Sequence, residues 1–114
     1  MRRLFVAAAT VALLSCVKSV EPRPLDVTVQ PDKLTTVAGD SIEFLVQGQG
    51  SNVAALQIDF GDNSADQFDT PGSAQQAQAR FKHPYSVAGV YDVQAKVIDV
   101  VLGEKTATTQ VTIH

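Results

Sequence analysis

Apolar and polar side chains alternate along most of the chain after residue 25, and glycine, proline, asparagine and aspartate interrupt the alternation at short intervals. A period of two places every second side chain on the same face of a β-strand. Strands buried on both faces would be continuously apolar, so the pattern predicts half-buried strands of antiparallel sheets. The expected inward-facing residues are Val27, Val29, Ile42, Phe44, Val46, Leu56, Ile58, Phe60, Ala77, Ala79, Phe81, Tyr91, Val93, Ala95, Val97, Val111 and Ile113.

Turn-forming clusters separate these runs at intervals of roughly ten residues, which is typical of antiparallel sandwiches and barrels. No helical stripe or heptad pattern is present in the sequence. About 90 residues are enough for one core of this kind. We therefore expect a single all-β domain over residues 25–114, and we expect it to make up the whole mature protein.

Tyr91 follows a corner of small residues, Ala88 and Gly89, at the start of one alternating run. This arrangement resembles the tyrosine corner of immunoglobulin-like sandwiches, in which the phenol hydrogen-bonds to backbone a few residues upstream. The resemblance places Val93 where antibody domains have their second cysteine. The alternative is an ordinary core tyrosine.

Two groups of residues resemble motifs of the polycystic kidney disease (PKD) domain family. The first resembles the family's Trp-Asp-Phe-Gly-Asp-Gly-Ser signature and reads Ile58, Asp59, Phe60, Gly61, Asp62, Asn63, Ser64. The second resembles the family's His-x-Tyr, Gly-x-Tyr and Val-x-Asp elements and consists of His83 with Tyr85, Gly89 with Tyr91, and Val97 with Asp99.

The PKD resemblance implies a seven-stranded immunoglobulin-like antiparallel β-sandwich. It also implies an extracellular, generally non-catalytic module that acts as a spacer or binds protein or carbohydrate. Ile58 replaces the family tryptophan and still suits an inward position, while Asn63 replaces a glycine and tolerates a left-handed turn. His83 is implied to pack or bond near the turn of Asp62.

The first sixteen residues form a separate unit: Met-Arg-Arg, an apolar run from Leu4 to Leu14, then Ser15 and Cys16. Two positive charges before a short apolar run are typical of a bacterial secretory signal. Eleven residues rise about 16 Å as a helix, against about 30 Å of bilayer core, so the run is too short to span a membrane.

The end of this unit, Leu13-Leu14-Ser15-Cys16, resembles a lipobox, although Leu14 is bulkier than the residue usual at its position. The resemblance implies that residues 1–15 are a lipoprotein signal peptide. Cys16 then becomes the new N-terminus and is lipidated on its sulfur and acylated, for example with palmitate, on its amine. Two or more acyl chains anchor a protein stably. The alternative is a signal peptide cleaved elsewhere, with Cys16 as an ordinary small residue.

Residues 16–24 are expected to be a short tether between the lipidated cysteine and the domain. Pro22 and Pro24 favour extended backbone, and nine stretched residues span at most ~30 Å. The mature chain has 7 basic and 12 acidic residues, a formal charge of −5, which does not favour anionic headgroups. Val17 replaces the aspartate of an inner-membrane retention signal, so in a diderm cell we expect the outer membrane.

Acidic residues are densest at Asp59, Asp62, Asp66 and Asp69. Asp62, Ser64 and Asp66 have the alternate spacing of an oxygen-rich Ca²⁺ loop. The glycine and distal glutamate of an EF-hand are absent. We therefore favour a turn held by side-chain-to-backbone bonds, with the outer aspartates solvated and no metal or other cofactor bound.

The composition argues against several function classes. A single cysteine excludes a disulfide framework and a multi-thiolate metal site. Nine basic against 12 acidic residues argue against nucleic acid as a partner. No Ser-His-Asp or Cys-His nucleophile is supported by the sequence, and we expect no catalytic residue and no enzyme activity.

The expected partners are the membrane, through lipidated Cys16, and an unidentified envelope protein or polysaccharide. No binding residue is assigned; the polar segment 70–78 is expected to be a surface loop, either a binding loop or a plain connection. One hypothesis is a lipoprotein that presents its domain for binding. The others are an accessory subunit that docks by an edge strand, and a calcium-stabilised adhesin.

Overall fold

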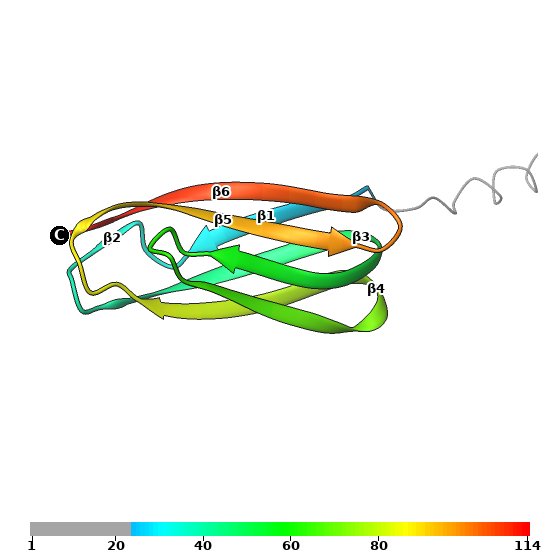
Figure 1. The fold of residues 1–114 in the computed structure, drawn as a ribbon, viewed down its shortest axis with the longest axis horizontal. Coiled ribbons are helices and arrows are strands. Elements are labelled where there is room, and N and C mark those ends of the chain that lie inside the picture. Colours follow the sequence, from blue (N-terminus) through cyan, green and yellow to red (C-terminus); the bar gives the residue numbers. More distant parts are fainter. Residues whose placement is uncertain (1–23) are drawn as a thin grey trace, which may run out of the picture.

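The computed structural model describes residues 24–114, apart from the side chain of Ser73. These residues contain no helix, and hence none long and apolar enough to cross a membrane. The expected signal peptide, Cys16 and all of the tether except Pro24 lie outside the described residues. Figure 1 shows the strands, which are β1 (Asp26–Pro31), β2 (Thr35–Thr36), β3 (Ser41–Asp59), β4 (Ala65–Pro84), β5 (Gly89–Asp99) and β6 (Gly103–Ile113).

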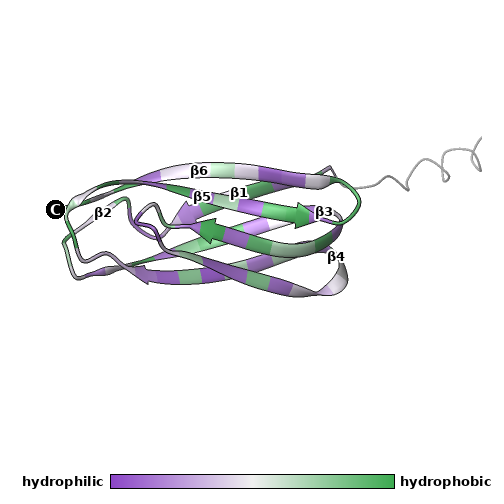
Figure 2. Ribbon diagram, in the orientation of Figure 1, coloured by the Kyte–Doolittle hydropathy of each residue, from purple (hydrophilic) through white to green (hydrophobic). Residues whose placement is uncertain are grey.

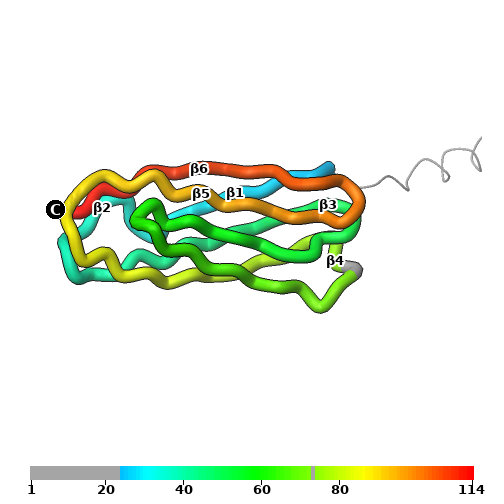
Figure 3. Tube along the Cα trace, in the orientation of Figure 1, coloured from blue at the N-terminus to red at the C-terminus, as the bar shows by residue number. Residues whose placement is uncertain are grey.

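The long strands β3 and β4 form an antiparallel ribbon that folds back on itself. The first half of β3 pairs with β1, and its second half pairs with β5. The register of the β3–β4 pairing shifts between Gln49 and Ala55, where both traces turn at one end of the molecule (Figure 3). A Cβ on Gly48 would lie 2.7 Å from a Leu56 methyl, so the two halves of β3 face each other across the core.

This fold-back produces a two-layer sandwich. One layer holds β1, the first half of β3 and the second half of β4. The other holds the remaining halves of β3 and β4 with β5, β6 and the two-residue β2. Counting the halves of β3 and β4 separately and setting aside β2 gives seven strands in residues 24–114, which confirms the predicted immunoglobulin-like sandwich.

The core lies between the two layers and follows the predicted alternation, which Figure 2 shows as changes of hydropathy along the strands. Most of the expected inward residues are buried, including Val93, at the position of the antibody cysteine, and Ile58, at that of the family tryptophan. Tyr91 is only partly buried and packs against the core. The core also holds Tyr85, which the alternation did not single out and which is fully buried.

The structure corrects the prediction for segment 70–78. β4 runs without a break through these residues, and Gln76, Ala77 and Gln78 pair with β3, so the expected loop is strand. The alternation predicts strand only from Ala77 onward; residues 70–76 are small or polar and give no apolar signal for a strand. Thr70 begins the bend, and its hydroxyl donates a 2.6 Å hydrogen bond to the carbonyl of Val53 in the neighbouring bend of β3.

The two ends of the sandwich hold different parts of the chain. At one end, which we call the Pro24 end, Gln49 bonds the carbonyl of Pro24, and the β5–β6 loop meets the bend of β3 through the 2.9 Å bond from Val100 N to Asn52 O. At the other, the His114 end, Ala38 N bonds His114 O. Figure 1 shows β5 and β6 running between these ends.

Candidate functional site

The turn between β3 and β4 is held to the end of β4 by side chains. Nε2 of His83 lies 2.7 Å from Oδ2 of Asp62 and 3.2 Å from Oγ of Ser64. The imidazole also stacks on Phe60, with ring centroids 4.0 Å apart and planes within 3°. The structure therefore brings together the two motifs that carried the PKD resemblance.

Asp62, Ser64 and His83 do not form a nucleophile and base, although their types are those of a hydrolase triad. Both Asp62 and Ser64 contact the same nitrogen of His83, whereas a triad uses one partner on each nitrogen. An ionised carboxylate only accepts, so Nε2 donates to Asp62 and has no lone pair for Ser64. The Ser64 hydroxyl itself donates to Asp62. The cluster fixes a turn.

The Asp62 carboxyl is tuned by opposing effects. Partial burial raises its pKa, but hydrogen bonds from Ser64 and His83 and the nearby imidazole outweigh burial, and the pKa lies below its ordinary value. Asp62 is therefore ionised at neutral pH. The ionised carboxylate holds the turn, because it accepts hydrogen bonds from the side chain and backbone of Ser64 and from His83.

The three calcium candidates do not converge in one loop. Asp62 and Ser64 lie in the turn, whereas Asp66 lies on β4 opposite Ile58 and accepts a hydrogen bond from the backbone of Gln67. Asp69 also lies on β4 and accepts from the Gln67 amide. Over residues 24–114, no group of three or more His, Cys, Asp or Glu side chains could hold a metal ion.

The turn itself uses left-handed backbone at two positions. Gly61 has a φ of 85° and Asn63 a φ of 71°. A Cβ on Gly61 would lie 2.5 Å from the carbonyl oxygen of Asp92, so both conformation and space require glycine there. Asparagine at position 63 is one of the few other residues that adopt this conformation readily.

Two tyrosines tie corners of the sandwich to the backbone. The buried phenol of Tyr85 donates a 2.9 Å hydrogen bond to the carbonyl of Phe60. Tyr91 donates a 2.6 Å bond to the carbonyl of Val87, four residues upstream, which is the geometry predicted for a tyrosine corner. Burial is the main cause that raises the pKa of Tyr85 above its ordinary value, so the phenol stays a donor.

Asp99 was noted only as a motif residue, and the structure gives it a central role at the Pro24 end. The residue is 3% exposed, and its carboxylate accepts from the backbone N–H of Asn52, Val101 and Leu102 at 2.7 to 2.8 Å. Burial raises its pKa, but the backbone hydrogen bonds outweigh burial and lower it. Gly50 leaves room for this carboxylate, because a Cβ there would collide with it.

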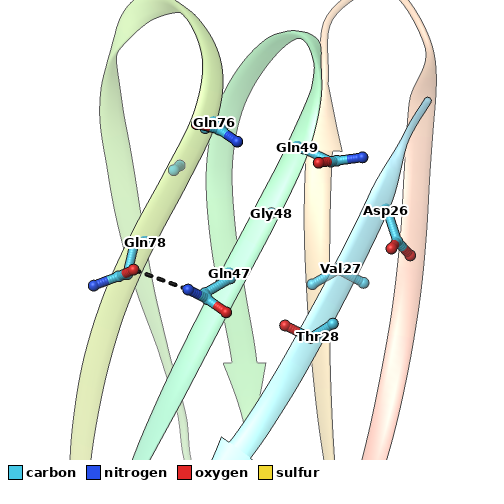
Figure 4. Close-up of a pocket in the computed structure, with 9 residues that line it drawn as sticks. Asp26, Val27, Thr28, Gln47, Gly48, Gln49, Gln76 and Gln78 are labelled. Atoms are coloured by element: carbon cyan, nitrogen blue, oxygen red, sulfur yellow. Dashed lines mark hydrogen bonds between the residues drawn. The ribbon is translucent and has the colours of Figure 1, made fainter. Parts of the chain in front are cut away.

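An amide-lined groove lies on the outer face of the layer formed by β1, β3 and β4. It has a volume of about 410 Å³, and Figure 4 shows its side chains rising from three neighbouring strands. Gln47 donates a 3.0 Å hydrogen bond to Gln78 across β3 and β4. The lining residues are Asp26, Val27, Thr28, Gln47, Gly48, Gln49, Gln76, Ala77 and Gln78.

Sequence reasoning did not find this groove. Its glutamines are spread over residues 47–49 and 76–78, and only strand pairing brings them together. The available signal was the repetition of glutamine at alternate positions, Gln47 and Gln49, then Gln76 and Gln78. A period of two places each pair on one face of its strand.

The sandwich is an immunoglobulin-like module in which His83 binds the turn of Asp62 and Ser64. Comparison with known families shows to which family of such modules it belongs. The family model of the PKD domain matches residues 26–113, nearly the whole described chain. The chain therefore belongs to the PKD domain family, and the predicted resemblance is confirmed. No curated protein sequence matches the chain.

Two solved structures are similar to the chain in fold. The PKD domain of an M14-like peptidase from a Thermoplasmatales archaeon has a TM-score of 0.66 and 21% identity, covering 82% of this chain and 98% of that one. The CARDB domain of the PF1109 protein of Pyrococcus furiosus, solved in complex with di-metal ions, has a TM-score of 0.60 and 14% identity, covering 84% and 97%.

Proposed function

We propose that this protein is a lipid-anchored, non-catalytic bacterial lipoprotein that presents its PKD domain at the cell envelope to bind protein or carbohydrate. The anchor is Cys16, lipidated after removal of residues 1–15. Support for the anchor comes from the charged and apolar leader followed by the lipobox-like Leu13-Leu14-Ser15-Cys16. In a diderm cell the anchor lies in the outer membrane. The domain acts without cofactor or metal.

The amide-lined groove is the observation that favours binding. Amide side chains both donate and accept hydrogen bonds, which suits hydroxyl groups of sugars and peptide groups of proteins. Four glutamines and a threonine give the groove such groups from three strands of a rigid sheet. Its one carboxylate, Asp26, has Lys105 within 3.5 Å, so the groove is close to neutral.

A matched pair of double variants tests the groove. Gln47→Ala with Gln78→Ala removes the hydrogen-bonded amide pair of the groove, whereas Gln57→Ala with Gln67→Ala removes an equivalent pair, 2.7 Å apart, on the other layer. We expect purified full-length protein to be retained on cell-wall material from its own host or on an envelope protein. Retention should fall with the first pair only; equal retention by both variants would contradict the groove as the binding site.

The free edge of β4 favours a second candidate, an accessory subunit that docks by strand addition. Within residues 24–114, β4 pairs only with β3, so one side of a 20-residue strand has no partner strand. Such an edge can template a strand of another chain. Amine-reactive crosslinking in intact cells distinguishes the candidates: Lys82 on β4 should then join one fixed protein, and Lys96 on β5 should not.

A further inference from the structure

The tip of the β5–β6 hairpin is unusually apolar for an exposed loop. Val100, Val101 and Leu102 are consecutive, and they are 69%, 67% and 44% exposed. Apolar side chains make no hydrogen bonds to water, so their exposure is unfavourable. Three adjacent large apolar residues on a surface are typical of an interaction site.

The backbone N–H groups of this tip are already hydrogen-bonded within the domain. Val100 N donates to the carbonyl of Asn52, and the N–H groups of Val101 and Leu102 both donate to Oδ1 of Asp99 at 2.8 Å. An apolar phase penalises backbone donors that lack partners. Asp99 and the carbonyl of Asn52 remove this penalty for the three N–H groups, which makes it easier for the apolar tip to enter a lipid surface.

The loops around the tip carry no charged side chain. At the Pro24 end the chain bends at residues 50–53, 70–74 and 100–103, which read Gly-Ser-Asn-Val, Thr-Pro-Gly-Ser-Ala and Val-Val-Leu-Gly. The His114 end also exposes large apolar side chains, those of Leu34, Val37, Val87 and Val90, but the same segment holds Lys33 and Asp40, which form an ion pair of 2.8 Å. The two ends therefore differ in the charge of their loops: at the Pro24 end the ion pair of Lys105 with Asp26 lies on the strands beside the loops rather than within them.

The position of the tether decides which end faces the membrane. The described chain begins at Pro24, and this residue is bonded at the same end as the tip. Residues 16–24 reach at most ~30 Å when fully stretched. A strand of 11 residues such as β5 is ~36 Å long, so a lipid on Cys16 cannot reach past the far end of the sheet.

We propose that Val100, Val101 and Leu102 insert into the membrane interface beside the lipid anchor and hold the sandwich upright on the bilayer. This inference rests on the proposed lipidation of Cys16. The anchor keeps the domain at the surface, and the tip fixes its orientation, with the His114 end directed away from the membrane.

Single-tryptophan variants of the full-length lipoprotein test the insertion. The chain has no tryptophan, so Val101→Trp and Val87→Trp each introduce a unique fluorophore at sites that are 67% and 66% exposed. Val87 lies in the turn before β5, away from the tip, and serves as the matched control. Each variant is reconstituted into phosphatidylcholine vesicles with or without brominated acyl chains, and Val100→Trp repeats the test at the tip.

We expect the emission of the Val101→Trp and Val100→Trp proteins to shift to the blue and to be quenched by bromine, and that of the Val87→Trp protein to show neither change. The mass of the N-terminal peptide from the same samples reports the anchor independently. A lipidated protein in which the tip is not quenched, or in which tip and control are quenched equally, would overturn the insertion and leave the anchor standing. An N-terminal peptide without lipid would overturn both.

Discussion

His83 and Asp62 are joined by a 2.7 Å contact between Nε2 and Oδ2 that spans 21 residues of sequence. The contact ties the turn that follows β3 to the strand end that follows the fold-back of β4. Phe60 takes part twice, because its ring stacks on His83 and its carbonyl accepts from Tyr85. The signature segment and the His-x-Tyr element of the PKD family thus form one structural unit in this chain.

Removing the carboxylate of Asp62 should destabilise the domain. Asp62→Ala leaves the mostly buried Nε2–H of His83 and the N–H of Ser64 without their acceptor, a loss of about 1–3 kcal/mol in the free energy of unfolding. Urea denaturation of the full-length protein measures it. Asp66→Ala is the control, since this exposed carboxylate bonds only its neighbour's backbone in the described chain. Equal free energies of unfolding for the two variants would show that the contacts of Asp62 with His83 and Ser64 do not stabilise the domain.

Calcium should not change the stability of the domain. The Asp62 carboxylate already accepts from His83 and Ser64, and Asp66 lies on a strand outside the turn. We therefore expect the melting temperature to be the same in calcium and in chelator. A melting temperature lowered by chelator would support the calcium-stabilised adhesin instead.

Asp99→Asn should destabilise the domain in a manner that depends on pH. The folded-state pKa of Asp99 is lowered, so its ionised form contributes stability that is present above the unfolded pKa, about 3.9, and is lost as pH falls through the folded value. We expect a loss of about 1–3 kcal/mol at pH 7, because buried N–H groups lose a charged acceptor. Urea titrations at pH 7 and in acid measure the difference.

The control for Asp99→Asn is Asp92→Asn, which removes a carboxylate whose recorded partner is the exposed amide of Gln110. The difference between wild type and Asp99→Asn should shrink below about pH 4. A difference that stays constant between neutral and acidic pH would mean that the charge of Asp99 has no part in its effect.

The two tyrosine hydroxyls should differ in their contribution. Tyr85→Phe leaves the carbonyl of Phe60 without its partner in a fully buried site, and we expect a loss of about 1–3 kcal/mol. Tyr91→Phe removes a bond at an exposed corner, where water can replace the phenol, and should cost about 0.5–1.5 kcal/mol at most. Thermal and urea unfolding give the order, and a larger loss at Tyr91 would contradict it.

The sequence predicted the parts of the fold that depend on local patterns. Alternation identified most inward residues of β3, β5 and β6, although not Val53 and Ala55, because a strand buries every second side chain regardless of its partners. The small residues before Tyr91 resemble a tyrosine corner and predicted a bond from its phenol to backbone a few residues upstream, and the acceptor is the carbonyl of Val87. Burial of Ile58 likewise followed from its place in an alternating run.

Features that depend on distant pairing were not predictable in this way. The role of Asp99 arises from the bend at Asn52, 47 residues earlier, and no local pattern links the two. The continuation of β4 through Gln76 was missed because an edge strand faces solvent and needs no apolar alternation. The groove was missed for the same reason, because only the pairing of β3 with β4 brings its glutamines together. For the anchor the reverse holds: its evidence is entirely local and lies before residue 24.

The most direct test of the proposed function is mass spectrometry of the N-terminal peptide of the protein extracted from membranes of its own host. We predict that the abundant form begins at Cys16 and carries a lipid on its sulfur and an acyl chain on its amine. An abundant, unmodified peptide that spans Ser15 and Cys16 would contradict the lipid anchor, and with it the orientation inferred for the β5–β6 tip.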